Sequence, residues 1–371
     1  MQLKSESSMH QALKIGQSFW YDGLIQTAEF RRMIDEDGLR GATTNPAIFE
    51  KALAGEEYDA QICEFSKTQD PEEIFKTLAI QAVQEVANIF LPVYQETRGL
   101  DGYVSLEVSP LLAYDTHATL REARELWRLV NRRNVMIKIP ATRESLPAVE
   151  TALADGINVN VTLIFSVERY REVMDAYIHG LEKRAGFDLP ISEIASVASF
   201  FVSRVDSAMD KILDNKIALS HSVSEKESLR GLLGKTAIAN SKVAYEEFRR
   251  VFSGARFQKL QSKGAILQRP LWASTGTKNP DYSDVLYVEA LIGPDTVNTM
   301  PPPTLAAFLD HGVAASAIES GMAAAHTTLK NLSEAGIDLA AVTENLEKAG
   351  VELFCEAYRK IIQRIGAKKG P

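Results

Sequence analysis

Short apolar or alternating segments recur along the chain, and longer segments with helical spacing lie between them. Leu120, Ala123 and Leu126 repeat at helical intervals, as do the apolar positions of residues 167–181. Strands that alternate with helices are expected to be parallel and joined by right-handed crossovers. Eight runs bounded by turn residues are predicted as strands: residues 19–22, 39–44, 103–108, 135–140, 157–163, 194–201, 266–274 and 285–290.

The polar positions within these strands help to choose between a closed barrel and an open, doubly wound sheet. Ser105 and Glu107 share one face of their strand, and Asn158, Asn160 and Thr162 share one face of theirs. In a barrel the apolar face contacts the helices, and the polar face lies in the lumen near its mouth. An antiparallel sheet with one solvated face would show the same alternation, but the long helical connections disfavour it. No GxGxxG or GxxxxGK[ST] motif follows the first strand, which disfavours a doubly wound nucleotide-binding fold.

The pattern therefore predicts an α/β fold, a (β/α)8 TIM barrel with additional N- and C-terminal helices. We expect one domain over residues 1–371, with an amphipathic C-terminal helix at about 342–366 packed on the exterior. Residues 270–303 are rich in proline and are predicted to form functional loops. A domain linker is disfavoured there because the strand-like run 285–290 interrupts the segment.

Lys138 is a charged residue inside the apolar run 135–140. With a period of two, Met136, Lys138 and Pro140 share one face, opposite the aliphatic face of the same strand. Burying an unpaired ammonium costs several kcal/mol, so a buried lysine is usually paired or used. A desolvated amine is also a nucleophile that forms a Schiff base with a carbonyl. The alternative is a lysine whose stem is buried while its ammonium reaches water.

Other polar residues lie at or near the ends of the predicted strands, where a barrel collects its catalytic groups. Schiff-base chemistry needs an amine, an acid or base that moves protons, and polar groups that hold substrate hydroxyls. Each candidate also has a structural alternative, such as a helix cap for Asn45 before Pro46 or a turn residue for Asp22 before Gly23. The candidates are Asp22, Thr43, Thr44, Asn45, Glu107, Lys138, Asn160, Thr162, Ser199, Arg204 and Ser274.

Composition argues against several classes of partner, although a local basic pocket is compatible with it. A formal net charge of -8 argues against a general affinity for nucleic acid or for an anionic membrane. Cys63 and Cys355 form no CxxC pair, and the six histidines lack close ligand spacing, so neither a disulfide framework nor a metal site is expected. No signal peptide and no run of about 18 apolar residues is present, so a cytoplasmic location is expected.

Five segments, taken together and in order, resemble the transaldolase family in its full-length bacterial type. The resemblance runs from about Ser18 to the C-terminal helix. It implies a (β/α)8 barrel without a cofactor, in which a lysine forms a Schiff base with a sugar phosphate. The segments are GATTNP at 41–46, VSLEV at 104–108, IKIPAT at 137–142, INVNVTLIFS at 157–166 and ASTGTKNP at 273–280.

The resemblance also implies a role for individual residues. Lys138 would form the Schiff base, Glu107 with Thr162 would position a water that shuttles protons, and Asp22 would deprotonate the sugar hydroxyl. Many relatives have a short Ser-Phe-Arg turn where this chain reads Ser274 to Lys278, so Lys278 is the hypothesis for the second phosphate cation. The substrate-binding candidates are Thr43, Asn45, Ser105, Asn160, Ser199 and Phe201 for the sugar, with Arg204, Ser274 and Lys278 for the phosphate.

The activity that the resemblance implies is the transfer of a dihydroxyacetone unit between sugar phosphates in the non-oxidative pentose phosphate pathway. Sedoheptulose 7-phosphate and glyceraldehyde 3-phosphate would be converted reversibly into erythrose 4-phosphate and fructose 6-phosphate. Three alternatives stay open. A fructose 6-phosphate aldolase-like enzyme would release dihydroxyacetone, although Glu107 and Phe201 stand where those enzymes usually carry glutamine and tyrosine. A noncatalytic sugar-phosphate binding protein would need no amine. A metal-dependent aldolase is disfavoured because no histidine cluster is visible.

Overall fold

The computed structural model describes residues 6–55 and 58–368, and its centre is a closed barrel of eight parallel strands. Each strand pairs with the next one along the chain, and β1 pairs with β8 to close the barrel. The predicted (β/α)8 barrel is therefore confirmed. The strands are β1 (Gln17–Asp22), β2 (Gly41–Thr43), β3 (Val104–Glu107), β4 (Val135–Pro140), β5 (Val159–Ile164), β6 (Ser196–Phe201), β7 (Arg269–Ala273) and β8 (Thr296–Met300).

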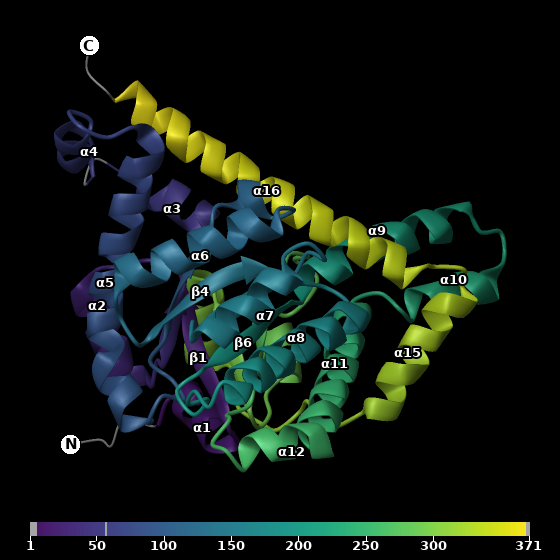
Figure 1. The fold of residues 1–371 in the computed structure, drawn as a ribbon. Coiled ribbons are helices and arrows are strands. Elements are labelled where there is room, and N and C mark those ends of the chain that lie inside the picture. The colour runs from purple at the N-terminus through teal and green to yellow at the C-terminus, as the bar shows by residue number, and fades with distance from the viewer. Residues whose placement is uncertain (1–5, 56–57, 369–371) are drawn as a thin grey trace, which may run out of the picture.

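Helices surround the barrel and form the connections between its strands (Figure 1). Among the described residues, one helix, α1 (Ser8–Ile15), precedes β1, and three follow β8: α14 (Pro302–His311), α15 (Met322–Glu334) and α16 (Leu339–Ala367). The others, in order, are α2 (Thr27–Arg32), the π-helical turn η1 (Met33–Asp37), α3 (Pro46–Ala52), α4 (Asp59–Phe65), α5 (Pro71–Glu96), the 3-10 turn η2 (Pro110–Leu112), α6 (Thr116–Val130), α7 (Leu146–Asp155), α8 (Val167–Gly186), α9 (Ser203–Leu219), α10 (Val223–Arg230), α11 (Thr236–Phe252), α12 (Ala255–Gln261) and α13 (Leu286–Ala290).

Seven of the eight predicted strands coincide with observed strands, but the eighth prediction was wrong. Residues 285–290 contain the short helix α13, and the eighth strand is β8 at Thr296–Met300. Within this helix Tyr287 and Val288 are buried, and the flanking residues Val285 and Leu291 are buried as well. A short apolar run is compatible with either element, which explains the error.

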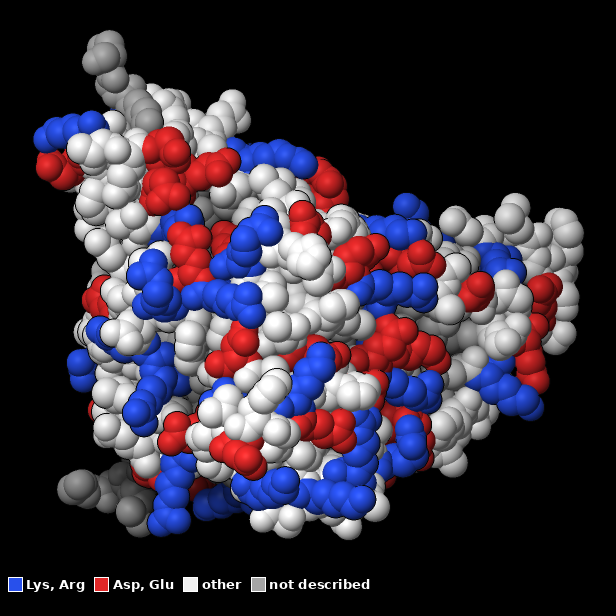
Figure 2. All heavy atoms as spheres, in the orientation of Figure 1, with Lys and Arg blue, Asp and Glu red and all other residues white. Residues whose placement is uncertain are grey.

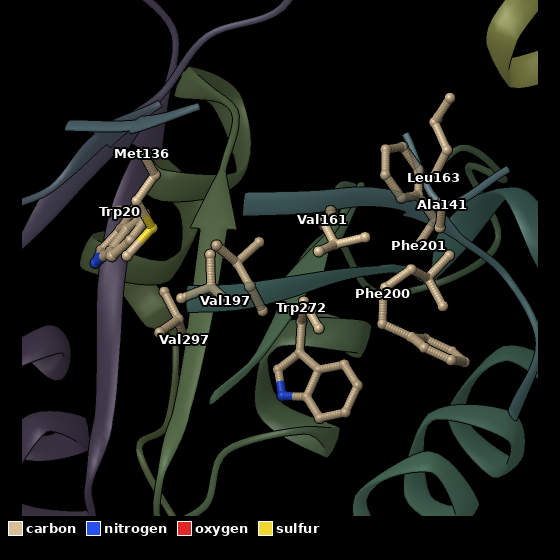
Figure 3. Packing of buried hydrophobic residues seen from close by; sticks show 14 of the residues in the cluster. Trp20, Met136, Ala141, Val161, Leu163, Val197, Phe200, Phe201, Trp272 and Val297 are labelled. Atoms are coloured by element: carbon tan, nitrogen blue, oxygen red, sulfur yellow. The ribbon is translucent and has the colours of Figure 1, made fainter. Parts of the chain in front are cut away.

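The core lies both inside the barrel and between the strands and the helices. Figure 3 shows part of this packing around Phe200 and Trp272, whose rings meet edge to face with centroids 6.0 Å apart. Inside the barrel, a Cβ at Gly41 would lie 2.8 Å from the indole of Trp20. Only glycine therefore leaves room for Trp20 beside β2.

A buried polar cluster lies among the residues at the amino-terminal ends of the strands. Arg269, at the start of β7, contacts Asp101 Oδ1 at 2.8 Å, and Ser18 donates a hydrogen bond to Asp101 Oδ2 at 2.7 Å. Trp20 Nε1 also donates to Asp101 at 3.2 Å. The cluster joins β1 and β7 to the residues before β3, at the end of the barrel opposite its mouth.

The last helix, α16, crosses the barrel and contacts α3, α5, α9 and β5. In Figure 1 it is the long yellow helix that runs along the top of the molecule from the side of α4 to α9. Gly350 allows the close approach to β5, since a Cβ there would lie 3.0 Å from Leu163. Arg169 of α8 adds an ion pair with Glu347, 3.1 Å from nitrogen to oxygen.

The outer surface carries charges of both signs. On the face drawn in Figure 2, blue and red side chains are interspersed, and ion pairs such as that of Arg256 with Glu182 at 2.6 Å join neighbouring helices. Within the described residues, α5 is the one helix that is long and apolar enough to cross a membrane. Its buried residues, including Val83 and Phe90, pack in the core of the molecule.

Candidate active site

A cavity of about 530 Å³ opens at the carboxyl-terminal ends of the strands. Its size is within the usual range for sites that bind small molecules. It is also where parallel barrels place their functional residues. Ten of the fourteen candidate residues line it: Asp22, Thr43, Asn45, Lys138, Thr162, Ser199, Phe201, Arg204, Ser274 and Lys278. The other four, Thr44, Ser105, Glu107 and Asn160, do not.

Lys138 is buried and paired in this cavity. Its Nζ lies 3.1 Å from Glu107 Oε2 and donates a hydrogen bond to the backbone oxygen of Thr44, also at 3.1 Å. Glu107 and Lys138 are direct partners in the register between β3 and β4, so the sheet itself holds the amine and the carboxylate together. The side chains are only 5% and 4% exposed. The alternative of a lysine that reaches water is therefore wrong.

The two carboxyl groups of the site both have perturbed proton affinities. Burial raises the pKa of Glu107 above its ordinary value, although the positive charge of Lys138 acts in the opposite direction. Burial likewise raises the pKa of Asp22 at the rim of the cavity, against the attraction of Lys138 and a hydrogen bond from Thr43. Both groups consequently hold a proton more readily than ordinary exposed carboxyls.

Apart from the ion pair of one of them with Lys138, two buried oxygens of the site have no hydrogen-bond partner. They are Glu107 Oε2 and the hydroxyl of Thr162. Unsatisfied buried polar atoms cost free energy and are rare in native structures, so they mark positions where a small polar molecule is favoured.

A chain of hydrogen bonds crosses three strands below the cavity. Ser199 donates to Asn160 Oδ1 at 2.7 Å, and Asn160 Nδ2 donates to Ser105 Oγ at 2.9 Å. Of the three residues, Ser199 lines the cavity, while Ser105 and Asn160 are completely buried. Asn160 and Ser105 therefore lie beneath the cavity lining, and their hydrogen bonds hold the Ser199 side chain.

Asn45 and Thr43 link the site to the start of α3. The Asn45 side chain accepts a hydrogen bond from the Ile48 amide at 3.0 Å and caps α3, with Pro46 following. The predicted cap is thus confirmed, and Asn45 lines the cavity as well. Thr43 donates to Asp22 at 2.8 Å, so Asp22 has a partner within the barrel and is not simply a turn residue.

The cavity also contains the residues predicted to bind a phosphate. Arg204 is at the start of α9, with its guanidinium carbon 5.6 Å from the centre of the Phe201 ring. Ser274 has a positive φ of 55° and its hydroxyl lies 3.1 Å from that of Ser203. Lys278 lines the same cavity from an exposed loop. The structure brings both predicted phosphate cations to one cavity.

Sequence reasoning missed Phe354 as a residue of the site. Its ring, on α16, lies 5.4 Å from Lys138 Nζ and is 4% exposed. The amphipathic pattern predicted a helix at about 342–366, which includes Phe354, but no feature of the sequence shows that this helix crosses the barrel mouth. The amine is thus enclosed by a carboxylate, a backbone carbonyl and an aromatic face.

Fold and site together define an enzyme-like (β/α)8 barrel with a buried lysine–carboxylate pair at its mouth. The family described as Transaldolase/Fructose-6-phosphate aldolase matches residues 19–365, and the chain belongs to this family. A Transaldolase from Trichodesmium erythraeum (strain IMS101) is 45% identical over 362 residues, covering 95% of each chain. A Transaldolase 2 from Nostoc sp. (strain PCC 7120) has the same identity and coverage. A Transaldolase from Mycobacterium tuberculosis (strain H37Rv) is 45% identical over 360 residues, covering 95% of this chain and 94% of the relative.

Proposed function

We propose that the protein is a transaldolase that moves a dihydroxyacetone unit from a ketose phosphate to an aldose phosphate. The donors are sedoheptulose 7-phosphate and fructose 6-phosphate, and the acceptors are glyceraldehyde 3-phosphate and erythrose 4-phosphate. The observation that carries the proposal is the buried Lys138 amine, 3.1 Å from Glu107 at the mouth of the barrel. Membership of the family and the names of the relatives support it.

The chemistry begins with attack of the Lys138 amine on the ketone carbon of the donor. The resulting carbinolamine loses water and becomes an iminium. Glu107 and Thr162 position a second water, which carries the protons that this conversion requires. Asp22 then takes the proton of the hydroxyl on the carbon beyond the bond that breaks. The carbon–carbon bond breaks, the electron pair passes into the iminium to give an enamine, and an aldehyde departs. Addition of the enamine to the acceptor and hydrolysis of the new iminium reverse these steps.

The raised pKa values of the two carboxyls suit this exchange of protons. A group that donates and accepts a proton works best when its pKa lies nearer to the working pH. Burial raises the pKa of Glu107 and of Asp22 in that direction. Desolvation at the barrel mouth therefore raises both pKa values in the direction that favours the proposed proton transfers.

The remaining residues hold the substrate. Ser199 and Asn45 face the cavity and bind the dihydroxyacetone hydroxyls, supported by Thr43, Ser105 and Asn160. At the other end, the planar guanidinium of Arg204 suits a phosphate, with Ser274 and Lys278 as additional ligands. Phe201 packs against Arg204 and limits its movement.

Borohydride trapping tests the proposal directly. Reduction in the presence of fructose 6-phosphate is expected to add one dihydroxyacetone unit to the intact protein, and peptide mapping is expected to place it on Lys138. Lys138→Ala abolishes both trapping and turnover. Lys51→Ala is the matched control, since Lys51 also lines the cavity but is exposed, and it retains trapping. Persistent trapping in the Lys138 variant contradicts the assignment.

Product analysis separates transfer from the rival activities. An aldolase that releases dihydroxyacetone needs no acceptor, so for that activity the release of dihydroxyacetone would be the same with and without erythrose 4-phosphate. For a transaldolase, product formation depends on the acceptor. A noncatalytic binding protein gives no reduced adduct. Within the described residues, no group of three or more His, Cys, Asp or Glu side chains is arranged to hold a metal ion. Activity that persists with a chelator argues against a metal-dependent aldolase.

We further propose that the enzyme works without a cofactor, in the cytoplasm, as part of the non-oxidative pentose phosphate pathway. Cys63 and Cys355 are both free thiols, which suits a reducing compartment. The net charge of -8 gives no electrostatic reason to bind nucleic acid or an anionic membrane. Fractionation of the cells that make the protein checks the location.

A further inference from the structure

The loop between β7 and α13, residues 274–285, carries Lys278 to the phosphate side of the cavity. The Lys278 side chain is exposed and, within the described part of the chain, makes no hydrogen bond or ion pair. Nothing bound to its own ammonium therefore fixes its position. Where Lys278 lies depends on how the backbone of the loop is held.

Bonds within the loop fix its shape. Thr277 donates a hydrogen bond to the backbone oxygen of Ser283 at 2.8 Å, which closes the segment around Lys278. Inside that segment, the Asp281 amide donates to the Asn279 side chain at 3.0 Å, and the Tyr282 amide donates to the Asn279 backbone oxygen at 3.2 Å. These bonds make the loop compact, but none of them ties it to the barrel.

A tyrosine–aspartate contact ties the loop to α9. The hydroxyl of Tyr282 donates to Asp210 Oδ2 at 2.9 Å, and Asp210 Oδ1 accepts from the Gly234 amide at 3.0 Å. Gly234 has a φ of 66°, and a Cβ there would lie 2.7 Å from the Tyr282 ring. The chain thus leaves room for this ring and satisfies both oxygens of a buried carboxylate around it.

The same helix begins with the other cation. Arg204 is six residues before Asp210 in α9, a rise of roughly 9 Å along the axis. One rigid helix therefore carries Arg204 directly and holds the loop of Lys278 through Tyr282. Two cations held at a fixed separation bind a dianion more tightly than mobile ones, because less entropy is lost on binding.

We propose that Asp210 and Tyr282 are positioning residues that hold Lys278 at a fixed distance from Arg204 in the phosphate subsite. This inference rests on the proposed function, in which Lys278 binds the substrate phosphate. Two other contacts hold the ends of the loop: Thr275 donates to Asn298 of β8 at 2.9 Å, and Asp284 lies 2.9 Å from His311 of α14. The Tyr282 contact lies between these two anchors and is the one that joins the segment around Lys278 to the helix of Arg204.

A second contact on the same helix offers a matched control. The hydroxyl of Tyr287 donates to Asp206 Oδ2 at 2.9 Å, one turn before Asp210. Tyr287 lies in α13, beyond the loop, and is buried. Its replacement removes the same kind of hydrogen bond without releasing the segment around Lys278.

The test measures phosphate affinity in Tyr282→Phe, Tyr287→Phe and Lys278→Ala. Inorganic phosphate serves as a competitive inhibitor with fructose 6-phosphate as substrate. Tyr282→Phe is expected to raise the inhibition constant of phosphate and the KM about fivefold to tenfold with kcat unchanged. This change corresponds to about 1–1.4 kcal/mol of binding free energy, the size of one ordinary protein hydrogen bond. Tyr287→Phe leaves both constants near their starting values. In a Lys278→Ala background, Tyr282→Phe has no further effect.

Several outcomes would overturn the inference. Unchanged phosphate inhibition in Tyr282→Phe, an equal loss in Tyr287→Phe, or an undiminished effect of Tyr282→Phe without Lys278 each contradicts it. If Lys278→Ala itself keeps full phosphate affinity, both the ligand assignment and the positioning role fail. Borohydride trapping at saturating substrate is read in the same variants and decides the fate of the proposed function separately.

Discussion

Replacing Lys138 by methionine leaves Glu107 as an unpaired carboxyl in a place that is nearly closed to water. At 3.1 Å and an effective dielectric constant of about 20, the attraction between the two charges is about 5 kcal/mol. Desolvation of both groups offsets part of this, and breaking a buried pair by removing one partner costs about 3–5 kcal/mol. We expect Lys138→Met to lower the free energy of the first urea unfolding transition by that amount near pH 8.

The loss should depend on pH in a defined direction. Burial already raises the pKa of Glu107, and removal of the Lys138 charge raises it further because that charge acts to lower it. A carboxyl whose pKa is raised by folding stabilises the fold fully below its unfolded pKa of about 4.3, and this stability is lost as the pH rises through the folded value. The difference between Lys138→Met and the parent protein should therefore grow between pH 5 and pH 8.

Urea unfolding followed by tryptophan fluorescence measures both effects. The double variant Lys138→Met with Glu107→Gln removes the unpaired charge and should recover most of the loss, which completes a double-mutant cycle. A coupling free energy below about 1 kcal/mol at pH 8, typical of an exposed ion pair, would refute the reasoning. So would a cost of Lys138→Met that is the same at pH 5 and pH 8.

Two other contacts make independent predictions. Phe354→Ala should raise the release of dihydroxyacetone in the absence of an acceptor several-fold, because the ring that covers Lys138 also excludes water from the enamine, whereas Phe354→Leu should stay near the parent value. Equal release from the two variants would contradict this role. Asp101→Asn leaves the guanidinium of Arg269 without its buried ion partner and should cost about 3–5 kcal/mol of unfolding free energy, while trapping on Lys138 persists. Loss of trapping at unchanged stability would contradict it.

Most of the barrel was predictable because its strands have a distinctive period. In β3, β4 and β5 the polar and apolar positions alternate, or an apolar run is bounded by turn residues, and both patterns were interpreted correctly. The eighth strand was not, because Thr296 and Asn298 are polar residues that are nevertheless completely buried. Thr296 accepts a hydrogen bond from the buried Gln17, so its burial depends on a partner 279 residues away. Such a strand has no local apolar signal.

The centre of the site was predictable for a similar reason. Lys138 and Glu107 are adjacent in the register of two strands, so the period that predicted the sheet also placed their side chains on one face. Phe354 was not predictable, since its contact with Lys138 requires a helix at the end of the chain to cross the barrel. The position of Lys278 likewise depends on Tyr282 and Asp210, which no spacing in the sequence connects.

Because Phe354 lies on α16, it is synthesised after all eight strands of the barrel. A ribosome makes the chain from its N-terminus, so β8 emerges before α16 has begun. All eight strands are therefore made while the nascent chain still lacks the aromatic ring above the amine. A product that terminates before α16 would carry a complete set of strands with an uncapped lysine, open to any aldehyde in its surroundings.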